Sequence, residues 1–171
     1  TSIETLDGAG GGSLPGAFAG PVVPFVTVPR TRTDSAVLLY SSGTTGQPKG
    51  ALISHGNLQS NTETLVAAWG FSAADCLLHA LPVYHAHGLF VGVGCTLMSG
   101  ASMVFLPRFE AREVLRWLPA CTVMMGVPTH YTRLLAEPGF DAGSCRSIRL
   151  FISGSAPLQP ETFAAFEQRT G

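Results

Sequence analysis

The chain has 171 residues, a net charge of −1 and 12% charged residues, where ordinary soluble domains have about 25%. So sparse and balanced a charge excludes a polybasic surface for nucleic acid or anionic membranes, because such sites need clustered Lys and Arg. The mean hydropathy of +0.29 excludes intrinsic disorder and is high for a chain of this length. We therefore expect one domain that belongs to a longer protein, whose other parts would cover its apolar faces.

The first part of the chain differs in composition from the rest. Residues 1–33 are rich in glycine and proline, which is typical of a loop or an arm. From Asp34 onward, short apolar runs alternate with stretches of helical periodicity. This change predicts an arm over residues 1–33 and a folded domain over residues 34–171.

The folded part alternates strands and helices. In chain order, short apolar runs predict strands at Ala36–Tyr40, Cys76–Leu81, Ser102–Leu106, Thr122–Met125 and Ile148–Ile152. Helical patterns predict helices at His55–Trp69, Gly88–Met98, Ala111–Leu118, Thr129–Ala136 and Pro160–Arg169. This alternation is typical of βαβ units, so we expect an α/β fold with a mainly parallel sheet and flanking helices.

Four unusual loops follow predicted strands, at Ser41–Gly50, Pro82–Gly88, Gly126–Pro128 and Ser153–Pro157. Ligands of parallel sheets bind beyond the carboxyl ends of the strands. We therefore expect these four loops to line one edge of the sheet and to form the site.

The segment Ser41–Gly50, with the sequence SSGTTGQPKG, carries the strongest chemical signal. Its glycines allow close approach of the backbone to a ligand, and its hydroxyl and N–H groups can surround phosphate oxygens. Lys49 adds a positive charge. The spacing excludes the P-loop of NTPases, because Pro48 stands where that motif needs its second glycine and Gly50 stands where it needs Ser or Thr.

The stretch YSSGTTGQPKGALISHGNL resembles the phosphate-loop signature of the superfamily of AMP-forming acyl-CoA synthetases, adenylation domains and luciferases. The blocks LPVYHAHGLF at Leu81–Phe90 and ISGSAPL at Ile152–Leu158 agree in order and spacing. The resemblance runs from about Asp34 to Gly171. Within the superfamily, the phrases MMGVPTHYTRLL and RLFISGSAPL are most similar to malonyl-CoA synthetases.

The resemblance implies part of the large N-terminal domain of an adenylate-forming enzyme. In such enzymes a carboxylate attacks the α-phosphate of ATP, and the thiol of CoA then displaces AMP from the acyl-adenylate. The implied cofactors are ATP and Mg²⁺, with CoA as co-substrate, and no protein ligand of the metal is expected in this segment. The implied phosphate-binding residues are Ser42, Gly43, Thr44, Thr45, Gly46 and Lys49.

Further site residues follow from the other two blocks. The resemblance implies a catalytic role for His85, beside the reacting carboxylate and the α-phosphate. It implies that the adenine and the acyl-adenylate are bound by Ser153, Gly154, Ser155, Ala156 and Pro157. Ser155 is not expected to be a nucleophile, because SGSAP lacks the pattern G-x-S-x-G. A metal site at His85 and His87 is disfavoured, because it has no evident third ligand.

A malonate-like substrate would leave one carboxylate unreacted, and burying that charge is costly without a partner. We expect His87 and Arg133 to bind it, since a guanidinium can grip a carboxylate through two hydrogen bonds. The alternative for Arg133 is a solvated helix residue. The expected partners are thus a malonate-like carboxylate, CoA and the remainder of the longer protein, with no nucleic acid.

Three functions remain open from the sequence. The first is a malonate–CoA ligase of fatty acid metabolism. The second is another carboxylate-activating enzyme, either a medium-chain or aryl acyl-CoA ligase or a domain that loads a carrier protein. The third is a non-catalytic nucleotide-binding module. The family's C-terminal lid and its catalytic lysine are not in this sequence, so we expect the 171 residues alone to be inactive.

The cellular setting is predicted from the cysteines and from the lengths of the apolar runs. The four cysteines are widely spaced and contain no C-x-x-C, which favours reduced thiols in the cytoplasm, or alternatively in an organelle matrix. The longest apolar stretch, residues 88–98, is too short for a membrane span, which needs about 20 residues.

Overall fold

The computed structural model describes residues 11–13, 16, 26–41 and 49–171. The chain divides into two units, residues 1–30 and residues 31–171. In the first unit, residues 26–30 have no regular secondary structure and are exposed. The second unit contains the helices and strands described below.

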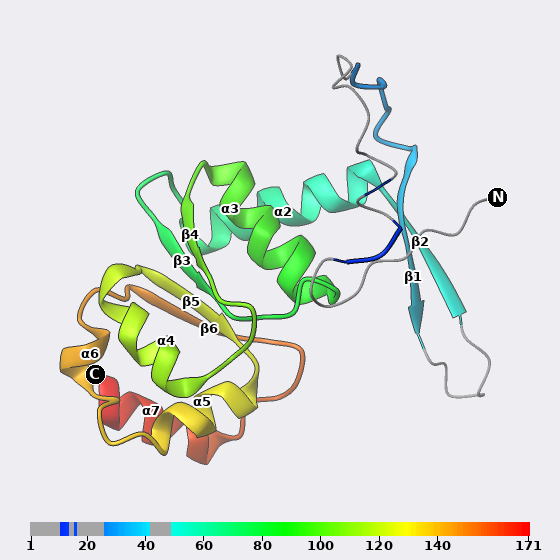
Figure 1. Cartoon of the computed structure of the whole chain (residues 1–171). Coiled ribbons are helices and arrows are strands. Elements are labelled where there is room, and N and C mark those ends of the chain that lie inside the picture. The colour runs from blue at the N-terminus through cyan, green and yellow to red at the C-terminus, as the bar shows by residue number, and fades with distance from the viewer. Residues whose placement is uncertain (1–10, 14–15, 17–25, 42–48) are drawn as a thin grey trace. The chain divides into compact units, whose positions relative to one another are not determined.

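The second unit is built on a four-stranded parallel sheet with helices on both faces (Figure 1). The strands are β3 (Cys76–His79), β4 (Ser102–Phe105), β5 (Val123–Gly126) and β6 (Leu150–Ser153), in the order β4-β3-β5-β6. The helices are α2 (His55–Trp69), the π-helix η1 (His87–Val93), α3 (Gly94–Ser99), α4 (Ala111–Trp117), the 3-10 helix η2 (Leu118–Ala120), α5 (Pro128–Leu135), α6 (Ala142–Cys145) and α7 (Pro160–Thr170). The α/β fold class is therefore confirmed.

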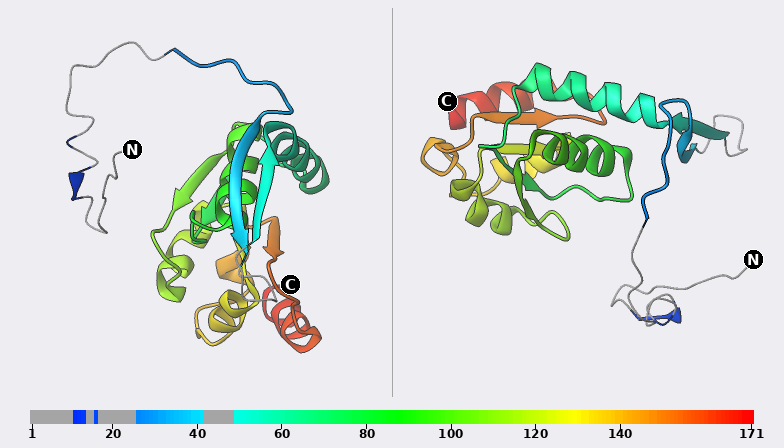
Figure 2. Two further views of the ribbon diagram at one scale, coloured as in Figure 1. Left: turned by 90° about the vertical axis from the view of Figure 1, so that its right-hand side faces the viewer. Right: turned by 90° about the horizontal axis from the view of Figure 1, so that it is seen from above.

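Both faces of the sheet are buried, as is usual for parallel sheets. Leu77 and Leu78 are successive residues of β3, so their side chains point to opposite faces, and both are completely buried. Leu77 belongs to a core that α2 and α3 cover, and Leu78 belongs to a core that α4, α5 and α7 cover. The views in Figure 2 show the same arrangement of helices about the sheet.

The first predicted strand does not join this sheet. β1 (Ser35–Ser41) pairs with β2 (Lys49–Ser54) in a separate antiparallel two-stranded sheet. The expectation that Ala36–Tyr40 belongs to the parallel sheet was therefore wrong, and strand β2 was not predicted. The short connection over residues 42–48 allows β2 to pair with β1 as an antiparallel neighbour, so β1 has its hydrogen-bonding partner in β2 and not in the parallel sheet. Only three of the four predicted loops follow strands of the parallel sheet.

The segment predicted as one buried helix at Gly88–Met98 begins as a π-helix and continues as α3. Gly92 packs directly on the ring of His79, where a Cβ atom would lie 2.8 Å from ring atoms. A Cβ atom on Gly88 would overlap the carbonyl oxygen of Pro82. These two close approaches place η1 against the end of β3 and against the loop that leads from β3 into η1, and π-helical turns are frequent at functional sites.

A buried ion pair fixes the amino ends of the strands. Asp75 is 3% exposed and receives hydrogen bonds from Arg149 Nε at 2.8 Å and Arg149 Nη2 at 2.7 Å. The hydroxyl of Thr122 donates to the same carboxylate at 2.7 Å. Hydrogen bonds from the Arg149 guanidinium hold the pKa of Asp75 well below its usual range. The network joins the starts of β3, β5 and β6 at the end of the sheet opposite the site.

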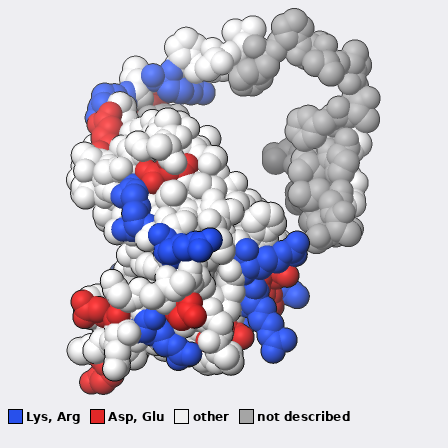
Figure 3. Space-filling model, turned by 90° about the vertical axis from the view of Figure 1, so that its left-hand side faces the viewer, with Lys and Arg blue, Asp and Glu red and all other residues white. Residues whose placement is uncertain are grey.

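The surface carries charges of both signs, and the thiols of the chain are unpaired. On the face shown in Figure 3, basic and acidic side chains are interspersed among uncharged ones. All four cysteines are free thiols, although Cys76 Sγ lies only 3.8 Å from Cys121 Sγ. Within the described ranges, no helix has the length and hydropathy needed to cross a membrane.

Candidate functional site

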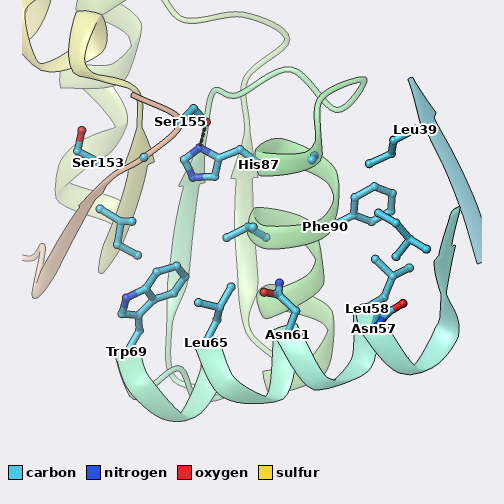
Figure 4. Close-up of a pocket in the computed structure, with 15 residues that line it drawn as sticks. Leu39, Asn57, Leu58, Asn61, Leu65, Trp69, His87, Phe90, Ser153 and Ser155 are labelled. Carbon is cyan, nitrogen blue, oxygen red and sulfur yellow. Dashed lines mark hydrogen bonds between the residues drawn. The ribbon is translucent and has the colours of Figure 1, made fainter. Parts of the chain in front are cut away.

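A cavity of about 610 Å³ lies between α2, η1 and the turn that follows β6 (Figure 4). Most of its wall is apolar, and its polar side chains come from η1, from the turn after β6 and from two asparagines of α2. The lining residues used below are Asn57, Leu58, Asn61, Leu65 and Trp69 from α2, His87, Phe90 and Val91 from η1, and Ile152, Ser153, Gly154 and Ser155 from β6 and its turn.

His87 and Ser155 form the polar end of this cavity. A hydrogen bond of 3.0 Å joins His87 Nδ1 and the hydroxyl oxygen of Ser155 (Figure 4). Burial lowers the pKa of His87, so the imidazole is neutral at neutral pH. A neutral ring that shares one nitrogen with Ser155 can offer its other nitrogen to a ligand.

The backbone of the turn after β6 is shaped around the same imidazole. Ser155 has a φ of 67°, a left-handed conformation that costs energy for a residue with a side chain. A Cβ atom on Gly154 would lie 2.9 Å from Cε1 of His87, so a glycine is needed for this approach. The Gly154 N–H donates to the carbonyl of Gly126 at 3.1 Å and ties the turn to the end of β5.

His85 lies near the same place but points into a smaller cavity. This cavity of about 250 Å³ is lined by His85, His87 and Ser155, together with residues of the loop after β3. The ring of His85 is exposed and lies 5.0 Å from the ring of Tyr84. The structure thus brings together the two predicted histidines and the predicted serine.

The other members of the Ser153–Pro157 segment are also placed at this edge. Ser153 lines the large cavity, and its buried hydroxyl has no hydrogen-bond partner within the described ranges. Ala156 and Pro157 are exposed. A buried hydroxyl without a partner is uncommon in a folded protein, and the Ser153 hydroxyl points away from the large cavity, toward the side of the sheet where Tyr131 and Phe166 lie (Figure 4).

Arg133 is not among the residues that line the large cavity. It lies on α5, where its Nη2 atom is 3.9 Å from Glu110 Oε2 and its guanidinium is 4.9 Å from the ring centroid of Phe109. It lines a second, charged depression together with Glu110, Arg112 and Glu137. The structure therefore separates Arg133 from the His87–Ser155 pair, with which the sequence had grouped it.

His130 lies on α5, close to the end of β5, since a Cβ atom on Gly126 would lie 3.3 Å from its Nδ1 atom. Its ring stacks on Phe109 with centroids 3.9 Å apart. The guanidinium of Arg133 packs on the same Phe109 ring, so His130 and Arg133 lie close together. Burial, and then the charges of Arg133 and His87, lower the pKa of His130 to about 4.

Most of the predicted phosphate loop lies outside the described residues, namely Ser42, Gly43, Thr44, Thr45 and Gly46. Lys49 is described: it is exposed and opens β2, where it pairs with Ser41. The residues that the structure describes contain no group of three or more His, Cys, Asp or Glu side chains able to hold a metal ion.

Sequence reasoning missed the contribution of α2 to the cavity. Asn57, Asn61, Leu65 and Trp69 recur at every fourth position, so they share one face of this helix. The sequence did contain a signal for this, because a helix face that packs on the core is normally apolar throughout. Two asparagines on an otherwise apolar face indicate that the face borders a cavity.

Comparison with known proteins assigns the family. The AMP-binding enzyme family matches residues 7–171. The chain is 39% identical to the mitochondrial malonate–CoA ligase ACSF3 of Mus musculus over 158 residues, which cover 82% of this chain and 27% of that protein. It is 36% identical to a long-chain-fatty-acid–CoA ligase of Bacillus subtilis over 153 residues, which cover 85% of this chain and 27% of that protein.

The fold also matches a solved structure. The crystal structure of ATP-bound MatB from Rhodopseudomonas palustris superimposes with a TM-score of 0.93 and 49% sequence identity. The match covers 99% of this chain and 34% of MatB. The chain therefore spans about a quarter of the length of the two ligases and about a third of MatB.

Proposed function

This chain belongs to the AMP-binding enzyme family, and from that premise we propose that it forms part of a longer protein that joins a carboxylic acid to CoA through an acyl-adenylate. The proposed acid is malonate or a close analogue. The sequence similarity to a malonate–CoA ligase supports this choice. Hereafter "the full-length protein" means this proposed longer protein.

The observation that carries the choice of acid is the polar end of the cavity at His87 and Ser155. A dicarboxylate that reacts through one carboxylate must leave the other one in the site, where it needs hydrogen-bond donors. The free nitrogen of the His87 ring can supply one. A simple alkyl chain would leave this nitrogen unsatisfied.

Arg133 is proposed as the cation that meets the free carboxylate. Its present partner, Glu110, lies 3.9 Å away, and both side chains are about half exposed, so the pair is weak. Burial is the main cause of the lowered pKa of His130, and the charge of Arg133 adds to it. Arg133 does not line the cavity, so we propose that it stabilises a carboxylate at the His87–Ser155 end through its charge.

The chemistry that we propose depends on positioning. Lys49 and the residues Ser42–Gly46 would hold the β- and γ-phosphates of ATP, which would enter as its Mg²⁺ complex. His85 would donate a hydrogen bond near the reacting carboxylate, and Ser153–Pro157 would hold the adenine and the acyl-adenylate. The carboxylate would displace pyrophosphate from the α-phosphorus, and the CoA thiol would then displace AMP from the acyl carbon.

The organisation of the protein is part of the proposal. Residues 1–33 form an arm, residues 34–171 form part of the adenylate-forming domain, and the lid lies elsewhere in the full-length protein. The short span relative to the known ligases supports the placement of the lid elsewhere. We propose that the 171 residues alone do not turn over and that the protein works in the cytoplasm or an organelle matrix. Steady AMP formation by the isolated chain would contradict the first part.

The decisive experiment measures acid-dependent AMP release by the full-length protein with ATP, Mg²⁺ and CoA. Malonate, methylmalonate, acetate, hexanoate and cinnamate are compared. We expect kcat/KM to be highest for malonate or methylmalonate, and Arg133→Ala to reduce it for these two acids by about tenfold or more. The matched control is Arg112→Ala, which removes a guanidinium that is 88% exposed in the same depression.

A second candidate function is favoured by the size and apolar wall of the cavity. A volume of about 610 Å³ lined by side chains such as Leu65, Trp69 and Phe90 suits a medium-chain or aryl acid better than malonate alone. A preference for hexanoate or cinnamate would establish this candidate and remove the proposed role of Arg133. AMP release that needs a carrier protein, or ATP binding without AMP release, would indicate the two remaining alternatives.

A further inference from the structure

We propose that Asn61 is a specificity-determining residue of the acyl site: its carboxamide binds the polar end of a short acid and disfavours an alkyl chain in the same space. This proposal rests on the proposed function, since it concerns which carboxylic acid the cavity accepts. It assigns a role to α2, a helix that otherwise supplies apolar wall.

The position of Asn61 on α2 directs its side chain into the cavity. Asn57, Asn61, Leu65 and Trp69 form one face of the helix, and Asn61 lies in the middle of that face. Figure 4 shows its carboxamide pointing from α2 into the space below η1. Apolar side chains such as Leu58, Leu65 and Val91 line the cavity around it, and Asn57 lies one turn before it on the helix.

Asn61 differs in its hydrogen bonds from the other two carboxamide side chains of α2. The oxygen of Asn57 accepts hydrogen bonds from the Ser54 N–H at 3.1 Å and from the Ser54 hydroxyl at 3.0 Å. Gln59 accepts from Arg32 at 3.0 Å and donates to Glu63 at 2.7 Å. Asn61 is exposed to water, and of these three side chains it is the only one whose carboxamide has no hydrogen bond to the described part of the chain.

An unpartnered carboxamide in an apolar wall discriminates between ligands. A carboxylate or other polar acyl end can accept a hydrogen bond from the Asn61 N–H and so replaces the water that it displaces. An alkyl chain displaces the same water but forms no hydrogen bond with the carboxamide. A site that hydrogen-bonds a polar group of its substrate discriminates strongly against analogues that lack this group. An apolar pocket discriminates much less against analogues that carry an extra polar group.

The cavity therefore has two polar features on opposite walls. The His87–Ser155 pair lies at the end formed by η1 and the turn after β6, and Asn61 projects from α2. Between them the wall is apolar and would otherwise admit a longer acyl chain. Asn61 makes that apolar volume unfavourable for such a chain, which reconciles a large cavity with a small polar substrate.

The test compares Asn61→Leu with Gln59→Leu in the full-length protein. Leucine has the same number of side-chain heavy atoms as asparagine and the same branch point, so the first change removes the polar group and keeps a branched side chain. The second removes a carboxamide from the same helix at a position that does not line the cavity. The measured quantity is the ratio of kcat/KM for malonate to kcat/KM for hexanoate.

We expect Asn61→Leu to lower this ratio by about tenfold or more, with a gain for hexanoate as well as a loss for malonate. Asn61→Asp keeps the shape and replaces the donor by a negative charge, so it should weaken malonate use by at least as much. Gln59→Leu should leave the ratio unchanged. If Asn61 had only a structural role, its replacement would lower kcat/KM for both acids by the same factor and leave the ratio constant. That result would overturn the proposal.

The outcomes also separate this proposal from the one on which it rests. An active wild-type protein whose substrate ratio is unchanged by Asn61→Leu would overturn the role of Asn61 and leave the ligase function standing. A wild-type protein that releases no AMP from any of the acids would overturn both.

Discussion

The Nδ1 atom of His87 lies 3.0 Å from the hydroxyl oxygen of Ser155, and this contact joins the first turn of η1 to the turn after β6. The two residues are far apart in sequence and come from the carboxyl ends of β3 and β6. Their contact holds the imidazole over Gly154, whose missing side chain leaves just enough room for the ring. The position of the imidazole is therefore set by the backbone of the neighbouring loop.

Gly154→Ala should disturb this arrangement. Its Cβ atom would lie 2.9 Å from Cε1 of His87, so either the ring or the turn must move. Because binding depends on the position of the ring, we expect KM for malonate to rise about tenfold or more in the full-length protein. Gly139→Ala is the control, since the nearest atom to its Cβ would be Leu115 Cδ1 at 4.0 Å. Equal KM values for the two variants would contradict this account of the turn.

The Asp75–Arg149 ion pair should be a main source of stability. Arg149→Leu would leave a carboxylate that is 4% exposed without its two guanidinium hydrogen bonds. Breaking a buried pair costs about 3–5 kcal/mol, and the 40% exposure of the Arg149 side chain reduces that to roughly 2–3 kcal/mol. The measurement is the free energy of unfolding in urea.

The control for this prediction is Arg112→Leu, which breaks a pair with Glu137 at 3.7 Å on an arginine that is 88% exposed. Exposed ion pairs contribute about 0–1 kcal/mol, so this variant should remain close to the wild type. If both variants lose the same stability, the buried network has no special role.

Gly92→Ala tests the origin of the π-helix. The new Cβ atom would lie 2.8 Å from Cε1 and Nδ1 of His79, a ring that is completely buried and stacks on Phe105. Such overpacking costs about 1–3 kcal/mol. Adding His79→Ala removes the clash, so the double variant should lose less stability than the sum of the two single variants. Additive losses would mean that this contact does not constrain η1.

Local signals were enough to locate some elements. Helix α2 begins and ends at His55 and Trp69 as predicted, because Ser54 caps its first turn and Gly70 ends it in a left-handed conformation. Helix α7 begins at Pro160 as predicted. The order of apolar runs likewise predicted the strands of the parallel sheet, since buried parallel strands are continuous in hydrophobicity.

Features that depend on contacts between distant residues could not be predicted in this way. The pairing of Tyr40 with Gly50 in the β1–β2 sheet depends on register, which an apolar run does not specify. The π-helical turns depend on the packing of Gly92 against His79. Of the site, the sequence predicted the meeting of His85, His87 and Ser155 but not the wall supplied by Asn61, because that wall forms only when α2 packs beside η1.

The pH dependence of stability should report on His130. Burial, followed by the charges of Arg133 and His87, lowers its pKa from 6.5 to about 4 in the folded chain. Between these two values the unfolded chain binds more protons than the folded chain, so the free energy of unfolding should fall as the pH drops from 6.5 to 4. The contribution of His130 over this range is up to about 3 kcal/mol.

His130→Gln isolates that contribution. At pH 8 both states of His130 are neutral, so the difference between wild type and variant there measures only packing, including the lost stack on Phe109. As the pH falls toward 4, the wild type should lose stability faster than the variant, because the variant has no proton to take up at this position. Burial also lowers the pKa values of His79 and His87. Both residues are present in the wild type and in the variant, so their contribution to the pH dependence of the free energy of unfolding is the same in the two proteins. Parallel curves for the two proteins between pH 8 and pH 4 would show that His130 titrates alike in the folded and unfolded chain, contrary to its buried, stacked position.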